Sequence, residues 1–311
     1  MQPRRFVLAL AAAGVVGACG PTDDGVLEPE VGRVEQAYTS PAQAERVKLA
    51  DIELNGLLLG NAAVPKAPLG ATDAVPDLIL GIAKSFGVVF KSACTQVETS
   101  GDADDDGVPQ ALTVRFNCLD QRLGGAYKSL TGVIRLSDPD DEVAGTGYNL
   151  TFNELKAFEH ASLAENHTRV LNGTAKIVII KATPMFAIGW VGITSDLAWR
   201  FADQHLLMLQ QVEYSSHNHG VYTRDKAVVL PMPSGTFQLW GSAAISWNGG
   251  KWSIFSYEAD PALRYSRRCE VVHPQGPGFY AGAVEYSGGG APLKIEFTGC
   301  NEWQVDEGGP I

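Results

Sequence analysis

The sequence contains none of the short motifs that mark the common catalytic sites. There is no G-x-S-x-G nucleophile elbow, no H-E-x-x-H zinc helix, no P-loop and no G-x-G-x-x-G turn in its 311 residues. These absences argue against serine hydrolases of the α/β type, zinc peptidases and nucleotide-binding enzymes. Paired carboxylates for glycoside hydrolysis stay open, because the fold rather than a local spacing brings such pairs together. We therefore expect a protein that is not an enzyme.

Positive charge is also scarce. The chain has 24 lysines and arginines against 35 aspartates and glutamates, which gives a formal net charge of −11. Nucleic acid and anionic lipid attract proteins that carry a broad positive surface. The charge balance argues against such a surface, so we expect no nucleic-acid partner.

No apolar run is long enough to cross a membrane as a helix, which takes roughly 20 residues. The run from Phe6 to Val16 follows Arg4 and Arg5 and precedes small residues. A short apolar run with basic residues before it and small residues after it is typical of a secretory signal peptide. The N-terminus therefore predicts export rather than a membrane span.

The small residues end in VGAC at positions 16 to 19, which resembles the lipobox of bacterial lipoproteins. The resemblance implies cleavage before Cys19, removal of residues 1–18 and acylation of the Cys19 sulfur. Gly20 follows where an aspartate would retain many lipoproteins in the inner membrane, so the outer membrane of a Gram-negative bacterium is favoured. Acyl chains would supply the anchoring, at about 0.8 kcal/mol for each buried CH₂. The alternative is an ordinary cysteine beside an ordinary cleavage site.

The other four cysteines are Cys94, Cys118, Cys269 and Cys300. An even number in an exported chain predicts disulfides, and three pairings are possible. We favour Cys94 with Cys118 and Cys269 with Cys300, because each pair brackets a short, turn-rich segment. There is no C-x-x-C and no Cys-His cluster at zinc spacing, which argues against a metal or redox site.

The spacing of apolar residues predicts the domain organisation and the fold class. Residues 19–45 are acidic, contain proline and lack periodicity, so we expect the acylated cysteine and a flexible tether there, followed by a single β-rich domain over residues 46–311. Before about Phe90 the pattern is apolar without alternation and predicts a short helical N-terminal portion. Beyond Cys94 apolar residues recur every second position, as in half-buried antiparallel strands. The expected class is mainly β, a large antiparallel sheet curled as a sandwich, half-barrel or barrel.

Glycine-containing pairs suggest where strands end. Asn248-Gly249 predicts a hairpin, residues 287–290 predict another connection, and Asn172-Gly173 predicts a turn before a strand. Two segments, residues 153–167 and 196–214, fit either a helix or a pair of strands.

The stretch DADDDG places Asp102, Asp104 and Asp106 at alternate positions before Gly107. It resembles the calcium loops of EF-hands, dockerins and thrombospondin type 3 repeats, and Ca²⁺ prefers such oxygen ligands. Thr113 stands where an EF-hand has its bidentate glutamate, so an EF-hand itself is excluded. The alternative is a solvated tip on a hairpin clamped by Cys94 and Cys118. The second acidic stretch, residues 138–142, lacks this spacing and predicts only a solvated loop.

Two further groups of side chains are candidates for binding sites. His217 and His219 lie in SSHNHG, which has the composition of a loop, so we expect solvated rather than metal-bound histidines. Aromatic residues gather near the C-terminus and suit either a ligand platform or ordinary cross-strand pairs, of which the pairs are favoured. They are Trp240, Trp247, Trp252, Tyr257 and Tyr265.

Together these features favour a lipid-anchored protein of the cell envelope with a non-enzymatic structural or interaction role, whose partner is an envelope protein or a glycan. One alternative is a carrier that holds an apolar ligand in a curved sheet, as in the lipoprotein-carrier and lipocalin folds. Such a carrier needs an apolar cavity of roughly 300 Å³ or more. Another alternative is an envelope glycan hydrolase with two convergent carboxylates.

Overall fold

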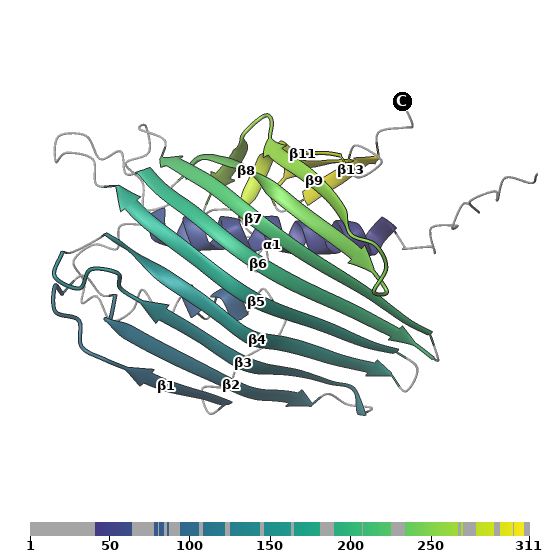
Figure 1. Cartoon of the computed structure of the whole chain (residues 1–311), viewed down its shortest axis with the longest axis horizontal. Helices are drawn as coiled ribbons and strands as arrows, with labels where there is room; N and C mark the ends of the chain where they lie inside the picture. The colour runs from purple at the N-terminus through teal and green to yellow at the C-terminus, as the bar shows by residue number, and fades with distance from the viewer. Residues whose placement is uncertain are drawn as a thin grey trace, which may run out of the picture. The chain divides into compact units, whose positions relative to one another are not determined.

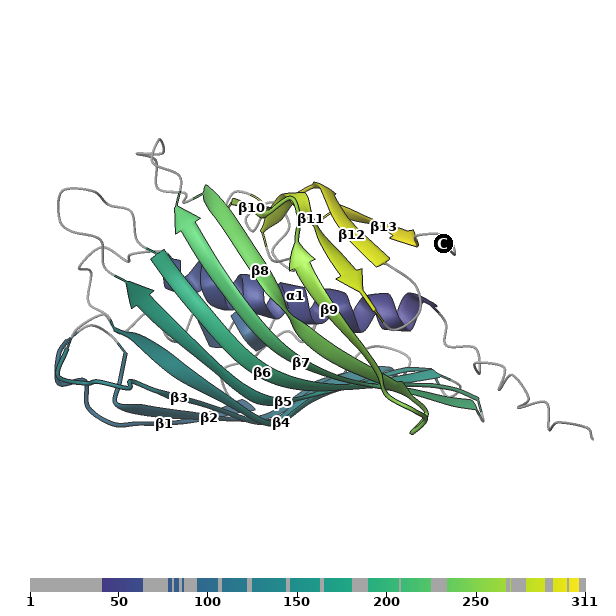
Figure 2. The same ribbon diagram turned by 45° about the horizontal axis from the view of Figure 1, so that its top comes forward.

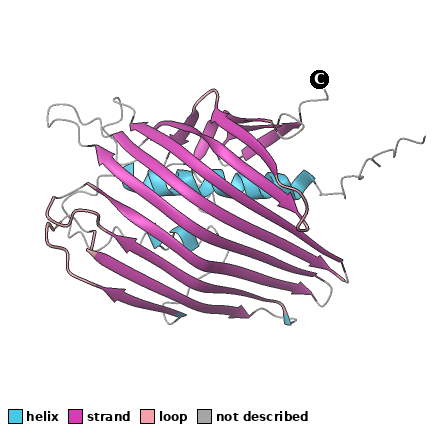
Figure 3. Cartoon of the chain, in the orientation of Figure 1, coloured by secondary structure: helices cyan, strands magenta, loops and turns pink. Residues whose placement is uncertain are grey.

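The chain forms one thirteen-stranded antiparallel sheet and an N-terminal helix, α1 (Pro41–Ala63) (Figures 1 and 3). The computed structural model describes residues 41–63, 78–79, 81–83, 86, 94–105, 108–121, 125–143, 146–162, 165–180, 190–206, 208–224, 234–266, 269, 278–288, 293–300 and 302–307. The expected fold class, mainly β with a large antiparallel sheet and a short helical N-terminal portion, is confirmed. The strands are β1 (Thr95–Thr99), β2 (Ala111–Gln121), β3 (Tyr127–Ser137), β4 (Gly147–Ser162), β5 (Glu165–Ile180), β6 (Trp190–His205), β7 (Met208–Arg224), β8 (Ser234–Trp247), β9 (Ser253–Ala259), β10 (Leu263–Ser266), β11 (Phe279–Ser287), β12 (Leu293–Gly299) and β13 (Glu302–Glu307).

The sheet is a meander in which strands β1 to β8 pair in chain order (Figure 1). From β8 the order continues through β10, β11, β12 and β13, while β9 pairs with both β8 and β11. Successive antiparallel strands need only short connections, which fits the turn-forming residues between them. Asn248-Gly249 forms the turn between β8 and β9, and β11 ends at Ser287 before β12, so two of the predicted connections are confirmed.

Helix α1 crosses the long strands on the concave side of the sheet (Figure 2). Its contacts fix this placement, because Tyr148 on β4 donates a hydrogen bond to Leu58 O at 3.3 Å and Arg46 donates one to Asp203 on β6 at 3.1 Å. Lys48 contacts β9, with its ammonium 4.7 Å from the centre of the Phe255 ring. We call the sheet face that packs on α1 the inner face and the opposite one the outer face.

The helix begins at Pro41, so the expected tether, residues 19–45, extends too far. Proline favours the first position of a helix, because its φ angle is already helical and its missing N–H would have no partner there. The acidic and polar composition of the segment concealed this start. Cys19, the predicted signal peptide and the rest of the predicted tether lie outside the described residues.

Both segments that fitted either a helix or two strands are strand pairs. Residues 153–167 span the end of β4 and the start of β5, and residues 196–214 span β6 and β7, with His205 opposite Met208 at the turn. Each of these strands has neighbours on both sides, and pairing with distant strands outweighs the local helical preference of the sequence.

The turn predicted at Asn172-Gly173 is wrong, because both residues lie inside β5. They lie opposite a bulge in β4, where Glu154 has a φ of 45°. The Asn172 side chain accepts a hydrogen bond from Glu154 N at 2.7 Å and donates one to Glu154 Oε1 at 2.8 Å. A Cβ on residue 173 would lie 2.1 Å from Asp196 O, so only glycine fits. The pair thus allows a bulge, not a chain reversal.

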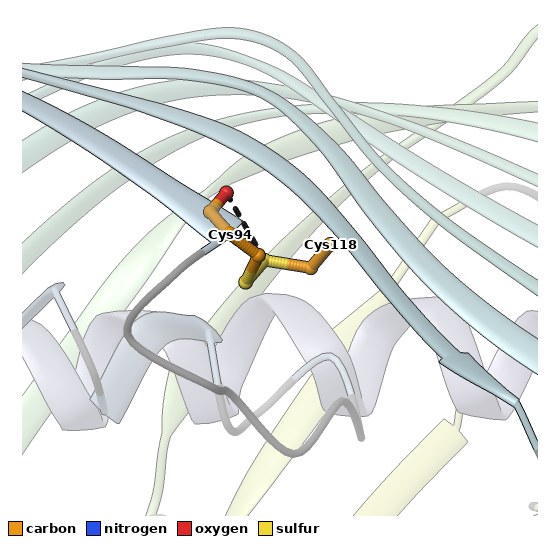
Figure 4. Close-up of a disulfide and its surroundings, with 2 residues drawn as sticks. All are labelled: Cys94 and Cys118. Atoms are coloured by element: carbon orange, nitrogen blue, oxygen red, sulfur yellow. Dashed lines mark hydrogen bonds between the residues drawn. A yellow bond between two sulfur atoms is a disulfide. The ribbon is translucent and has the colours of Figure 1, made fainter.

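Both predicted disulfides are confirmed. Cys94 bonds to Cys118 at the base of the β1–β2 hairpin (Figure 4), and Cys269 bonds to Cys300. The register pairs Thr99 with Leu112, so the described residues between the two strands, 100–105 and 108–110, belong to the tip of the clamped hairpin, as expected. The first bond closes a sequence separation of 24 residues, which places the aspartates at the far end of a constrained loop.

Candidate functional site

The outer face of the central strands carries a groove with a volume of about 450 Å³. Its lining comes from two adjacent rows of residues that run across the strands. In the first row Asp196 on β6 lies opposite His217 on β7, which lies opposite Ser242 on β8. The second row runs from β5 to β9 and consists of Asn172, Ala198, Ser215, Ala244 and Ile254.

Small side chains produce the groove. Ala198, Ser215 and Ala244 lie directly opposite one another on three neighbouring strands, so only short side chains project from the sheet there. Directly opposite residues on paired strands have Cβ atoms about 5 Å apart, which makes the row continuous. Asn172 closes one end of the row, and Ile254, which is 71% exposed, stands at the other.

The loop predicted for SSHNHG is wrong, because His217 and His219 lie in the middle of β7. This strand carries polar residues on both faces. Ser216 and Asn218 are buried on the inner face, and the two histidines point outward. The segment therefore looks polar throughout, although it is a central strand. Buried polar partners on α1 make this composition stable.

His217 is fixed by its neighbours on the outer face. Its Nδ1 donates a hydrogen bond to Asp196 Oδ1 at 2.5 Å, and its ring meets the His219 ring edge-on at 4.6 Å between centroids. The His219 ring in turn stacks on Trp240, with centroids 5.9 Å apart. Asp196, His217 and Trp240 are all exposed, so this ladder forms a solvent-facing border beside the groove.

The order Asp196, His217, Ser242 is that of a serine-hydrolase triad, but its surroundings differ. A triad also needs backbone N–H groups that bind the oxyanion. Ser242 sits in a strand paired on both sides, opposite His217 and Ser256, so the backbone N–H groups around it serve the sheet. The groove lining also includes a single carboxylate, Asp196, whereas glycoside hydrolysis by paired carboxylates needs two. The arrangement suits binding.

On the inner face a buried polar network joins α1 to β6 and β7. Asp51 Oδ1 accepts hydrogen bonds from Trp199 Nε1 at 3.2 Å and Ser216 Oγ at 2.9 Å. Ser195 Oγ donates to Asn55 Oδ1 at 2.8 Å, and Asn218 Nδ2 donates to both serine hydroxyls. The network fixes the position and rotation of α1 because the side chains of both Asp51 and Asn55 have hydrogen-bond partners on the strands.

Burial raises the pKa of Asp51 to about 6, although hydrogen bonds from Ser216 and Trp199 favour the charged form. Burial likewise raises the pKa of Glu53 to about 7, against the positive charge of Arg169. It lowers the pKa of Lys48 to about 8, and the Lys48 ammonium lies 4.5 Å from the centre of the Tyr286 ring. The helix thus brings ionisable groups into the core at a cost in free energy.

At the hairpin tip, Asp102 and Asp104 lie with Asp141, and one carboxylate oxygen from each falls within 4.8 Å of the others. Asp141 also accepts a hydrogen bond from Ala103 N at 3.1 Å. Asp106 lies outside the described residues. The expectation that residues 138–142 form only a solvated loop is wrong for Asp141, because the β3–β4 connection folds against the tip. These three carboxylates are the described residues that could hold a metal.

The aromatic residues near the C-terminus divide between the two faces. Tyr257 and Tyr265 are buried on the inner face, whereas Trp240 and Trp252 are 39% and 50% exposed. Tyr257 lies across Gly241, where a Cβ would approach its hydroxyl to 2.8 Å. The expectation of ordinary core packing thus holds for the tyrosines, whereas Trp240, two residues from Ser242 on β8, lies beside the groove.

Comparison with protein-family models, with curated proteins and with solved structures finds no match for this chain. Among the helices that the structure describes, none combines the length and apolar character of a membrane span.

Sequence reasoning missed the groove because its residues are ordinary one by one. Ala198, Ser215 and Ala244 come from three strands and become neighbours only through the register. The one signal available is alternation: in DLAWRF every second residue is large and apolar, and the residues between them are Asp196, Ala198 and Arg200. That pattern identifies an outer face, but not which strands adjoin.

Proposed function

We propose that the protein is a lipid-anchored, non-enzymatic binding protein of the bacterial cell envelope, and that the outer face of its sheet is the interaction surface. The supporting observation is the contrast between the two faces. The inner face is filled by α1, while the outer face of β5 to β9 carries an open groove of about 450 Å³. The lipobox-like VGAC sequence at Cys19 supports anchoring, and Gly20 favours the outer membrane.

The anchor is tested by changing Cys19 to serine. The wild-type protein should incorporate an alkyne analogue of palmitate and sediment with membranes, because acyl chains hold it there. Cys19→Ser should incorporate no label and remain uncleaved or soluble. Normal labelling of the mutant would contradict the lipobox reading.

The interaction surface is tested by thiol protection. The four other cysteines are held in disulfides, so a single added cysteine can be followed with a maleimide reagent. Ala244→Cys in the groove should react in purified protein and be protected after mixing with isolated cell envelopes. Asn117→Cys on the outer face of β2 is the matched control and should react in both. Equal reactivity of Ala244→Cys in both samples would contradict an interaction through this surface.

The carrier alternative is favoured by a different observation, the costly burial of ionisable groups on α1. Lys48 and Asp51 make the helix a poorer core element than an apolar helix would be, as expected for an element that can be displaced by an apolar ligand. Asn55→Cys with Ser195→Cys would tether α1 to β6, since the native side-chain oxygens are 2.8 Å apart. A carrier should lose binding of a fluorescent fatty acid on tethering and regain it on reduction.

We also propose that the aspartate tip binds calcium in a structural role. Asp102, Asp104 and Asp141 supply three hard oxygen ligands from two connections, and backbone carbonyls or water complete the six to eight that Ca²⁺ prefers. Few protein ligands suit the millimolar to submillimolar affinity of extracellular modules.

A further inference from the structure

The groove on the outer face runs across the strands rather than along them. Its second row reaches from Asn172 on β5 to Ile254 on β9, which is four strand spacings. At about 4.8 Å per spacing, the row is roughly 19 Å long. That length suits several linked rings of an extended polymer.

We propose that this groove binds a neutral linear oligosaccharide laid across strands β5 to β9. The proposal rests on the proposed function, because it names the chemical class that the outer face would bind. Four observations carry it: the alternation of groups in the groove, the aromatic border, the charge around it and the pairing of its strands.

Apolar and hydrogen-bonding groups alternate in the groove. Ala198, Ala244 and the exposed Ile254 offer apolar contact, while Ser215 and Ser242 offer hydroxyls that both donate and accept. A sugar ring has the same mixture, with C–H groups on its faces and hydroxyls on its rim. The carboxylate of Asp196 is 67% exposed and can accept further hydrogen bonds from such hydroxyls.

An aromatic border lies along the same side. Trp240 is two residues from Ser242 on β8, so the two side chains are about 7 Å apart on one face. Stacking on His219 fixes the plane of the indole, and 39% of Trp240 remains exposed. A fixed, exposed indole can cover the apolar face of a ring.

The carboxylates beside the groove disfavour anionic polymers. Trp240 lies opposite Glu258, and Glu258 lies opposite Glu285 on β11. Lys294 pairs with Glu285 at 2.9 Å, Arg200 pairs with Glu154 at 3.9 Å, and Asp196 is hydrogen-bonded to His217. Glu258 and the exposed carboxylate of Asp196 are therefore the acidic groups that face the ligand beside Trp240 and in the groove. A polyanion would meet like charge here and the chain's net charge of −11, so a neutral glycan fits better.

An extended peptide fits less well. Peptides that bind sheets usually add a strand at an edge, where backbone groups are unpaired. Strands β6, β7 and β8 each have partners on both sides, so their backbone groups are already used. A ligand on this face must be held by side chains alone, which suits a saccharide.

The test is isothermal titration calorimetry of the full mature lipoprotein in detergent micelles. The probes are a β-1,4-linked N-acetylglucosamine hexamer, cellohexaose and, as the anionic comparison, hexagalacturonate. At least one neutral hexamer should bind with a Kd below about 1 mM, and hexagalacturonate should bind at least tenfold more weakly. Ala198→Trp, which fills the centre of the groove, and Trp240→Ala should each weaken binding about tenfold or more.

The matched control is Asn117→Trp, which adds the same side chain to the outer face of β2 and should leave affinity unchanged. Circular dichroism and thermal melting check that each variant folds, and Ala244→Leu replaces Ala198→Trp where it does not. Absence of binding by both neutral hexamers, binding insensitive to a filled groove, or equal binding of the anionic hexamer would each overturn the proposal. Protection of Ala244→Cys by envelopes without any glycan binding would overturn the glycan alone and leave the proposed function intact.

Discussion

The inner and outer faces of strands β6 to β8 are built from alternate residues of the same sequence and have opposite properties. Inward from β7 point Tyr214 and Ser216, both buried and packed or hydrogen-bonded against neighbouring elements. Outward point Ser215 and His217, which are exposed. One face is committed to holding α1, so its residues are constrained by packing. The other can vary without unfolding the protein, and such a surface is where binding specificity can develop.

The largest expected effect comes from breaking the inner face. Tyr214 is 1% exposed, and Tyr214→Ala should lower the free energy of unfolding by about 3 to 5 kcal/mol, because it leaves a cavity against α1. Its outer neighbour gives the contrast: Ser215→Ala should stay within about 0.5 kcal/mol of wild type. Urea denaturation of both variants measures the difference. A similar loss of unfolding free energy in Tyr214→Ala and Ser215→Ala would show that the outer face is also part of the core.

A smaller and pH-dependent effect is expected at Asp51. Its ordinary pKa of 3.8 rises to about 6 on folding, because the carboxyl is buried. The folded state therefore binds more protons than the unfolded state between pH 4 and 6, and stability contributed by this group is lost as pH rises through that window. The loss is on the order of 3 kcal/mol for a shift of this size.

The measurement compares wild type with Asp51→Asn by urea denaturation at several pH values. Asparagine can still accept hydrogen bonds from Ser216 and Trp199 but does not titrate, so the variant should gain relative stability as pH rises from 4 to 7. Asp196→Asn on the outer face is the control for removing a carboxyl. Parallel stability curves for wild type and Asp51→Asn would show that this carboxyl does not titrate across the window.

Local patterns predicted much of the fold. Alternation marked strands such as β2 and β12, because each has one buried face, and the cysteine spacing predicted both disulfides. The alternation pattern failed where contacts with a distant element decide the composition of a strand. SSHNHG resembles a loop because its inner residues, Ser216 and Asn218, belong to the buried polar network that includes Asp51 of α1 rather than to an apolar core. Only the long-range pairing of helix and sheet explains that composition.

The candidate site was less predictable than the fold. A groove made of Ala198, Ser215 and Ala244 depends on strand register, which no local spacing encodes. Asp141 was missed for a related reason, because a loop 37 residues after Asp104 in the sequence folds beside it. Asp102 and Asp104 could be recognised in the sequence because they lie two positions apart in one loop.

The last and smallest effect contrasts the two acidic sites of the molecule. Asp51 is buried and is stabilised by protonation and hydrogen bonds, whereas Asp102, Asp104 and Asp141 share a partly exposed tip where a cation can balance them. A ligand that binds only the folded state adds about 2.7 kcal/mol at one hundred times its dissociation constant and about 0.4 kcal/mol near it. Calcium should therefore raise the melting temperature modestly.

Thermal melting in calcium and in chelator tests this expectation with Asp141→Asn, which removes the ligand that the sequence did not predict. The wild type should melt higher in calcium, by several degrees at saturation, because about 1 kcal/mol moves the midpoint of a large domain by roughly 2 to 4 °C. Asp141→Asn should lose most of that difference, while Asp306→Asn on edge strand β13, far along the chain from the tip, should keep it. If wild type and Asp141→Asn melt alike in both buffers and calorimetry shows no heat with calcium, the three carboxylates form only a solvated tip. If Asp306→Asn loses the calcium effect as well, the ion acts through general screening of the acidic surface rather than at this site.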